Sequence, residues 1–141
     1  MDYIEVKLDP GAFEPVRAHD DDAGMDLKAK SAQTIFAGGS MCFDTGVHLA
    51  IPKGYYGKIE SKSGLNVRHG IVSCGGVIDA SYRGSIVVKL YNLSERPYYV
   101  EAGEKIAQLI IIPCETPKLK LVDILDDTER GSGGFGSTGR F

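Results

Sequence analysis

The chain has 141 residues, 43% hydrophobic and 25% charged, which fits one globular domain. Its net charge of −3 lacks the basic excess of general nucleic-acid binders, so we expect no direct nucleic-acid partner. The longest apolar run, Leu109–Ile112, is too short to cross a bilayer, and the N-terminus does not have the pattern of a signal peptide. Three scattered cysteines indicate neither a disulfide framework nor a zinc site. We therefore expect reduced thiols, no membrane association, and a cytoplasmic location, or the host cytoplasm for a viral source.

Short strands with regular turns dominate the chain. Apolar and polar residues alternate along residues 4–8, 47–51, 86–90 and from Leu119 onward, the pattern of half-buried strands. Eighteen glycines indicate many turns, and the best helical candidate is a short turn at Gly64–His69. Many short strands predict an all-β sandwich or barrel. We expect one domain over residues 1–127 and a flexible glycine-rich arm over residues 128–141.

One segment places an acid next to an aromatic ring at a predicted hairpin tip. In GVIDASYRG (Gly76–Gly84), Asp79 follows the strand-like pair Val77 and Ile78 and precedes Tyr82. An acid beside a ring suits a site for a water nucleophile, whereas an ordinary acidic turn residue gives the same local pattern. The segment alone leaves both interpretations open.

A second segment, ESKSGLN (Glu60–Asn66), precedes the predicted helical turn. It brings Lys62, Ser63 and Gly64 to the start of that turn. Backbone donors at a helix start, a hydroxyl and an ammonium together form a phosphate site. A helix N-cap serine beside a solvated lysine is an equally good interpretation of the same residues.

Two more segments place a polar residue within a predicted strand. AGMDLKA (Ala23–Ala29) sets Asp26 between apolar neighbours, and GEKIAQ (Gly103–Gln108) ends on Gln108 among apolar residues. The structural interpretations are a buried hydrogen-bonded acid for Asp26 and a solvent-facing strand residue for Gln108. Either side chain also suits a polar binding site.

The C-terminal segment RGSGGFGSTGRF (Arg130–Phe141) is the richest in glycine. Alone it is typical of a disordered tail, because glycines lose the most backbone freedom on ordering. Its backbone N–H groups, hydroxyls and Arg130 can also wrap a phosphate chain, and Phe135 can cover a flat ring.

Together and in this order, the five segments resemble the motifs of the trimeric dUTPase (deoxyuridine triphosphate nucleotidohydrolase) family. The resemblance covers nearly the whole chain, and the matches of GVIDASYRG and the C-terminal segment are specific. It implies a β jelly roll that forms a homotrimer with active sites shared between subunits. It further implies hydrolysis of dUTP to dUMP and pyrophosphate, which limits uracil incorporation into DNA and supplies dUMP for dTMP synthesis. Mg²⁺ is the implied cofactor, held mainly by the triphosphate.

The resemblance also implies roles for individual residues. Asp79 would deprotonate the attacking water, Tyr82 would exclude a ribose 2′-hydroxyl, and Asp26 would act on the metal through water. Uracil would be read by backbone groups of Ser73, Gly76, Val77 and Ile78. The phosphates would be bound by Lys62, Ser63, Gly64, Gln108, Arg130 and Ser137. Phe135, followed by Gly136, would stack on uracil from the arm of a third subunit.

Three positions depart from the family pattern. Lysines stand at Lys62 and Lys105, where the family usually has arginine, and Ser73 stands where many relatives have a uracil-contacting asparagine. Lysine keeps the charge but lacks the two-pronged guanidinium geometry. Two alternatives share the scaffold: a dCTP deaminase, which needs a glutamate about where this chain has Lys89, and a regulatory protein that binds another protein.

Overall fold

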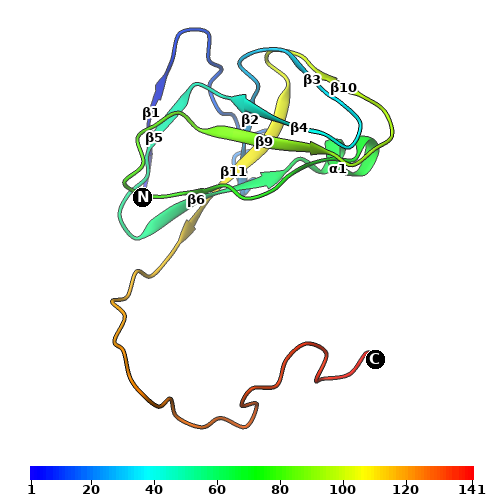
Figure 1. Ribbon diagram of the computed structural model, residues 1–141. Coiled ribbons are helices and arrows are strands. Elements are labelled where there is room, and N and C mark those ends of the chain that lie inside the picture. The colour runs from blue at the N-terminus through cyan, green and yellow to red at the C-terminus, as the bar shows by residue number, and fades with distance from the viewer.

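The strands form an all-β body with one short helix and a long C-terminal tail. The computed structural model describes residues 1–141 (Figure 1). In chain order the elements are β1 (Glu5–Leu8), β2 (Gly24–Lys28), β3 (Gln33–Ile35), β4 (Ser40–Asp44), β5 (Val47–Ala50), β6 (Tyr55–Ser61), α1 (Ser63–His69), β7 (Ile71–Ser73), β8 (Val77–Ile78), β9 (Val87–Asn92), β10 (Tyr98–Val100) and β11 (Lys105–Pro113). The predicted all-β fold class is confirmed, and the arrangement is that of a jelly roll.

Antiparallel pairing arranges the strands in two main sheets. One has the order β2-β11-β6-β8 and the other β4-β9-β7, while β1 pairs with β5 and β10 pairs with β3. The central strand β11 brings Gln108 opposite Asp26 of β2 on one side and opposite Glu60 of β6 on the other. Three segments that are distant in the sequence therefore meet across this sheet.

The core follows from the alternation along the strands. Ile86, Val88 and Leu90 are each 1% exposed, whereas Val87 and Lys89 between them point outward. Strands of both main sheets and of the two small ones contribute to a single cluster of 17 buried apolar residues. Burial of apolar surface at about 25 cal/mol per Å² is the main force that holds such sheets together. The sequence periodicity thus predicted which faces are buried.

The helix α1 agrees with the predicted turn at Gly64–His69 and begins one residue earlier. It ends at Gly70, whose φ of +66° is a left-handed conformation that glycine adopts without a Cβ penalty. Arg68 and His69 lie in its last turn, where positive charge is favourable. This helix does not have the length and apolar character that crossing a membrane requires.

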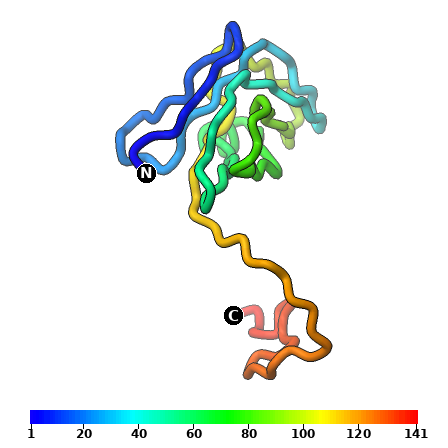
Figure 2. Tube along the Cα trace, turned by 90° about the vertical axis from the view of Figure 1, so that its left-hand side faces the viewer, coloured from blue at the N-terminus to red at the C-terminus, as the bar shows by residue number.

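The tail leaves the body after β11 and extends away from it (Figure 2). Its hydrogen bonds are local, such as those from Gly131 to Thr128 and from Ser137 to Gly134. The strand predicted from Leu119 onward does not form, and Leu119 is 96% exposed. Alternation gives a segment strand propensity, but a strand also needs a partner for its backbone, and none lies beside the tail. The boundary at residue 127 stays a prediction.

Candidate active site

Three of the five motifs meet on the sheet β2-β11-β6. Asp26 and Gln108 are paired across β2 and β11, and β6 leads directly into Lys62 and α1. Gln108 donates from Nε2 to the carbonyl oxygen of Ser61 at 3.1 Å, which fixes its amide beside the end of β6. A Cβ on Gly24 would collide with the Gln108 side chain, coming within 3.0 Å of its Cβ. The glycine of the first motif therefore makes room for the glutamine of the fourth.

Asp26 is the centre of this polar cluster. Its carboxylate, in a residue only 5% exposed, accepts from Lys62 Nζ at 2.5 Å and forms an ion pair with Lys105 Nζ at 3.1 Å. Burial alone would raise the pKa of Asp26, but the hydrogen bonds and charges of the two lysines outweigh burial and hold that pKa below its ordinary value. The cluster carries two positive charges and one negative charge, which leaves a net attraction for phosphate.

The two lysines are the positions at which the sequence departs from the family pattern. The sequence treated Lys62 and Lys105 as separate departures, yet both contact the same carboxylate. One aspartate between two long side chains can accept two single-pronged ammonium groups, which need less room than two planar guanidinium groups. Sequence reasoning missed this contact because it depends on the alignment of β2 with β11.

The residues near Asp26 do not form a cage for a metal ion. No group of three or more His, Cys, Asp and Glu side chains is placed to hold one, and both carboxylate oxygens of Asp26 already face lysines. Mg²⁺ prefers to keep several waters and to bind substrate phosphates. This donor set fits an ion that arrives on phosphate groups and meets Asp26 only through water.

The start of α1 presents free donors next to the cluster. Ser63 is the first helical residue and is exposed, as is Gly64. Lys62 occupies the N-cap position without a side-chain cap, so the alternative of a Ser63 N-cap is wrong. The chain reverses from extended at Lys62 into the helix, which exposes the first backbone N–H groups.

The third motif forms a tight turn after β8. Asp79 is exposed, and its carbonyl oxygen accepts from the Tyr82 backbone N–H at 3.0 Å, as in a hydrogen-bonded turn. Tyr82 donates its hydroxyl to the carbonyl oxygen of Ser85 at 2.8 Å. A Cβ on Gly84 would lie 2.5 Å from Cζ of the Tyr82 ring, so only glycine lets the ring fold across the chain.

The segment expected to read uracil lies along the edge of the same sheet. Val77 and Ile78 form β8 and pair with β6, while Ser73 ends β7. Gly76 has a φ of +97°, and a Cβ there would lie 2.7 Å from Cβ of Ile59. The backbone therefore approaches β6 closely, and the Ile59 N–H donates to the Gly76 carbonyl at 2.9 Å.

One serine joins the third motif to the cluster on β6. Ser61 Oγ accepts from the Ser73 backbone N–H at 2.8 Å and donates to the Ser73 carbonyl at 3.3 Å. The same Ser61 supplies the carbonyl that Gln108 holds. These contacts make Ser61 a further structural residue of the site, which its strand position in the sequence did not indicate.

The structure leaves the fifth motif apart from the others. Arg130 donates from Nε to the carbonyl oxygen of Gly133 at 2.8 Å, and Phe135 is fully exposed with a φ of +51°. Gly136 and Ser137 follow in local turns of the tail. The chain thus brings the first, second and fourth motifs together, links the third to them through Ser61, and places the fifth outside its own body (Figure 2).

A jelly roll with a positively charged strand-end cluster and an exposed acid in a turn defines an all-β protein that handles a phosphorylated small molecule. The family model for dUTPase matches residues 13–139, and the chain belongs to the dUTPase family. A deoxyuridine 5′-triphosphate nucleotidohydrolase of Paramecium bursaria Chlorella virus 1 is 42% identical over 94% of both chains. The mouse enzyme of that name is 43% identical over 96% of this chain and 83% of its own.

Solved structures agree with the sequence relatives. The dUTPase of Staphylococcus bacteriophage 80alpha, in a complex with dUpNHpp, has a TM-score of 0.93 and 30% identity, over 99% of this chain and 100% of that one. The dUTPase of phage phi11 of S. aureus, described with a structural Mg(II) ion, has a TM-score of 0.81 and 27% identity, over 87% of this chain and 98% of that one. These relatives do not favour the deaminase or the regulatory alternative.

Proposed function

We propose that this chain hydrolyses dUTP to dUMP and pyrophosphate. The observation that carries the proposal is the exposed Asp79, fixed by its backbone in the turn that also holds Tyr82, in a chain whose relatives are named dUTP nucleotidohydrolases. Removal of dUTP limits uracil incorporation into DNA, and the product dUMP supplies dTMP synthesis. As a dUTP diphosphatase it acts on a small molecule.

In the proposed reaction, Asp79 orients a water molecule and takes its proton. The water oxygen bonds to the α-phosphorus, the bond from that phosphorus to the α–β bridging oxygen breaks, and pyrophosphate leaves. The Asp79 side chain has no hydrogen-bond partner within the chain, which leaves its carboxylate available to water. Proton transfer to a positioned base contributes on the order of 10²–10⁴ in rate, and charge stabilisation supplies much of the rest.

The phosphates would meet the positively charged cluster of another subunit. Lys62, Ser63 and Gly64 would bind phosphate oxygens, and Gln108, held by Ser61, would contact the phosphate end. Mg²⁺, when bound, supplies positive charge that neutralises the phosphates and the developing negative charge. Asp26 would reach it through water, because both of its oxygens hold lysines.

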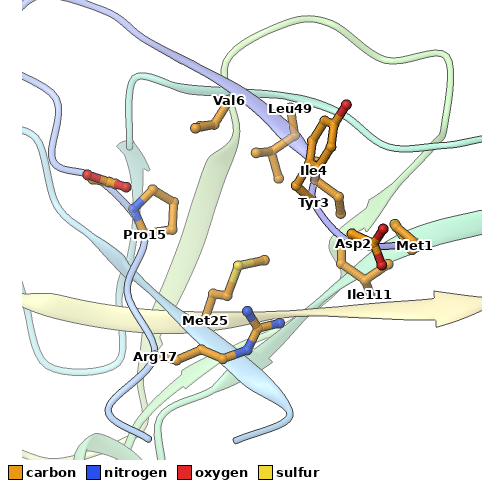
Figure 3. A pocket seen from close by; sticks show the side chains of 11 residues that line it. Met1, Asp2, Tyr3, Ile4, Val6, Pro15, Arg17, Met25, Leu49 and Ile111 are labelled. Atoms are coloured by element: carbon orange, nitrogen blue, oxygen red, sulfur yellow. The ribbon is translucent and has the colours of Figure 1, made fainter. Parts of the chain in front are cut away.

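The tail supports the proposal of a homotrimer with shared active sites. Five apolar side chains between β11 and the fifth motif are half or more exposed: Leu119, Leu121, Val122, Ile124 and Leu125. Such a run needs a covering surface, and a second copy of the chain offers one. The outer edge of β1 is unpaired, and beside it lies a pocket of about 400 Å³ with Ile4, Val6, Met25 and Leu49 in its wall (Figure 3).

Within that trimer, the arm would complete a site on a neighbouring subunit. Arg130 and Ser137 would reach the phosphates, and Phe135, fully exposed here, would stack on uracil. The free thiols of Cys42, Cys74 and Cys114 support a reducing compartment, and we propose the cytoplasm.

The test is a pyrophosphate-release assay with dUTP, dCTP, dTTP and UTP, with and without Mg²⁺. We expect metal-dependent release from dUTP only. Asp79→Asn should keep dUTP binding, measured by calorimetry, and lose at least about 10²-fold in turnover. The matched control is Asp123→Asn, another exposed aspartate, which lies in the tail. Near-normal turnover by Asp79→Asn would remove the base assignment, and ammonia release from dCTP would replace the proposal by the deaminase.

A further inference from the structure

His48, on β5, joins the turn of the third motif to the N-terminal strand. Its Nδ1 lies 2.7 Å from the carbonyl oxygen of Arg83, and its Nε2 lies 3.0 Å from Oδ1 of Asp9. Arg83 belongs to the third motif, directly after Tyr82, whereas Asp9 follows β1. The imidazole is thus a bridge between two segments that the sheet does not otherwise connect. Neither the sequence motifs nor the proposed mechanism uses this histidine.

The two partners of His48 determine its protonation state. A carbonyl oxygen and a carboxylate oxygen can only accept hydrogen bonds, so both ring nitrogens must donate. Only the imidazolium carries both protons, because the neutral ring has one donor and one acceptor. The bond to the Arg83 carbonyl, followed by the bond to Asp9, raises the pKa of His48 above its ordinary value, in agreement with the geometry.

Charged groups approach the ring from β1, β4 and the third motif. They are Glu5, Lys7, Asp9, Asp44 and Arg83. Lys7 is paired with His48 across the strands and opposes protonation, whereas Asp9 favours it. The guanidinium of Arg83 donates to the Ala80 carbonyl at 2.6 Å, within its own turn. The acidic partners thus outweigh the one lysine that faces the ring.

The turn that His48 holds is the turn that carries Tyr82. The Tyr82 ring is partly exposed and is held by the Ser85 carbonyl, while Ser85 Oγ donates to Asp44 of β4. Two anchors therefore tie this turn to the body on either side of Gly84: His48 to Arg83, and Asp44 to Ser85. Loss of either anchor gives the Tyr82 ring more freedom.

We propose that His48, as an imidazolium, is a positioning residue that fixes Tyr82 and thereby sharpens the discrimination between dUTP and UTP. The proposal rests on the function proposed above, in which Tyr82 excludes the 2′-hydroxyl. When His48 loses a proton, one of its two bonds must break, and an unprotonated nitrogen faces an acceptor. The turn then tolerates a bulkier sugar. Discrimination should fall as pH rises through the raised pKa of His48.

The kinetic test compares kcat/KM for dUTP and UTP from pH 6 to 9 with the full chain and Mg²⁺. The ratio of the two values cancels titrations that affect both substrates alike. We expect the wild-type ratio to fall on the order of tenfold with rising pH, the effect of one charge-assisted hydrogen bond. His48→Gln should show the lower ratio at every pH. His19→Gln, which alters an exposed histidine paired only with Asp22, should keep the wild-type step.

A second measurement does not need substrate. Histidine NMR on the ligand-free protein should show His48 titrating above its ordinary range, with amide shifts of Tyr82 and Ser85 following the same curve. Asp9→Asn should lower that titration and move the kinetic step to lower pH. An ordinary His48 titration, or a step that persists in His48→Gln, would overturn the proposal. If the wild type released no pyrophosphate from dUTP, the proposed function would fail, and the NMR titration would still decide whether His48 holds the turn.

Discussion

Asp26→Asn should destabilise the protein and do so in a pH-dependent manner. The substitution keeps the shape of a nearly buried side chain and removes the charge that holds Lys62 and Lys105. Asparagine retains one acceptor oxygen, so one lysine can stay hydrogen-bonded while the other loses its partner. Both lysines can regain water, because their side chains are 29% and 46% exposed.

The magnitude follows from the exposure of the two pairs. A hydrogen bond to a charged group contributes about 1.5–3 kcal/mol, and the pair with Lys62 belongs at the low end of that range because its ammonium is partly solvated. The pair with Lys105 resembles a surface ion pair, which contributes roughly 0.2–1 kcal/mol. We therefore expect Asp26→Asn to lower the free energy of unfolding by about 2 kcal/mol near pH 7.

The sign of the pH dependence follows from the direction of the shift. The folded pKa of Asp26 is lowered from its ordinary value of 3.8. The stabilisation is therefore fully present above that value and is lost as pH falls through the lower folded pKa. The difference between wild type and Asp26→Asn should shrink as the pH is lowered below about 4.

Urea unfolding at fixed protein concentration measures both effects, since assembly makes the midpoint depend on concentration. The control is Asp22→Asn, which alters an exposed carboxylate paired with His19 and should change the unfolding free energy by less than about 0.5 kcal/mol. An Asp26→Asn variant within that margin at pH 7 would show that the ion pairs give no net stability. A gap that persists unchanged in acid would show that the charge is not the cause.

Two further predictions concern glycine and the tail. Gly76→Ala should destabilise by about 2 kcal/mol more than Gly54→Ala in urea unfolding, because both have positive φ but only Gly76 also meets Ile59; equal losses would remove the steric argument. Deletion of residues 130–141 should leave the circular dichroism spectrum and unfolding free energy within about 0.5 kcal/mol of wild type, yet severely reduce pyrophosphate release; an unfolded product would contradict the view that this segment contributes nothing to the core.

The sequence alone determined the class of fold and the inventory of the site. Period-two alternation identified the buried faces of several strands, as Ile86, Val88 and Leu90 illustrate, because the pleat of a strand fixes side-chain direction locally. It also identified α1 within one residue. The five motifs and their order identified the family, since each motif is a short contiguous segment. Burial pattern and motif order are local properties, which explains why they can be read without coordinates.

Only the tertiary structure decided which of these residues touch. Asp26 and Lys62 are 36 positions apart, and His48 and Arg83 are 35 apart, so their contacts depend on strand pairing and loop placement. The alternation from Leu119 onward predicted a strand that the single chain does not form, because the partner of a strand is chosen in space rather than in sequence. The sequence thus determined what each segment can be. The packing of the sheets determined that one carboxylate holds two lysines and that one histidine anchors the turn of the proposed catalytic acid.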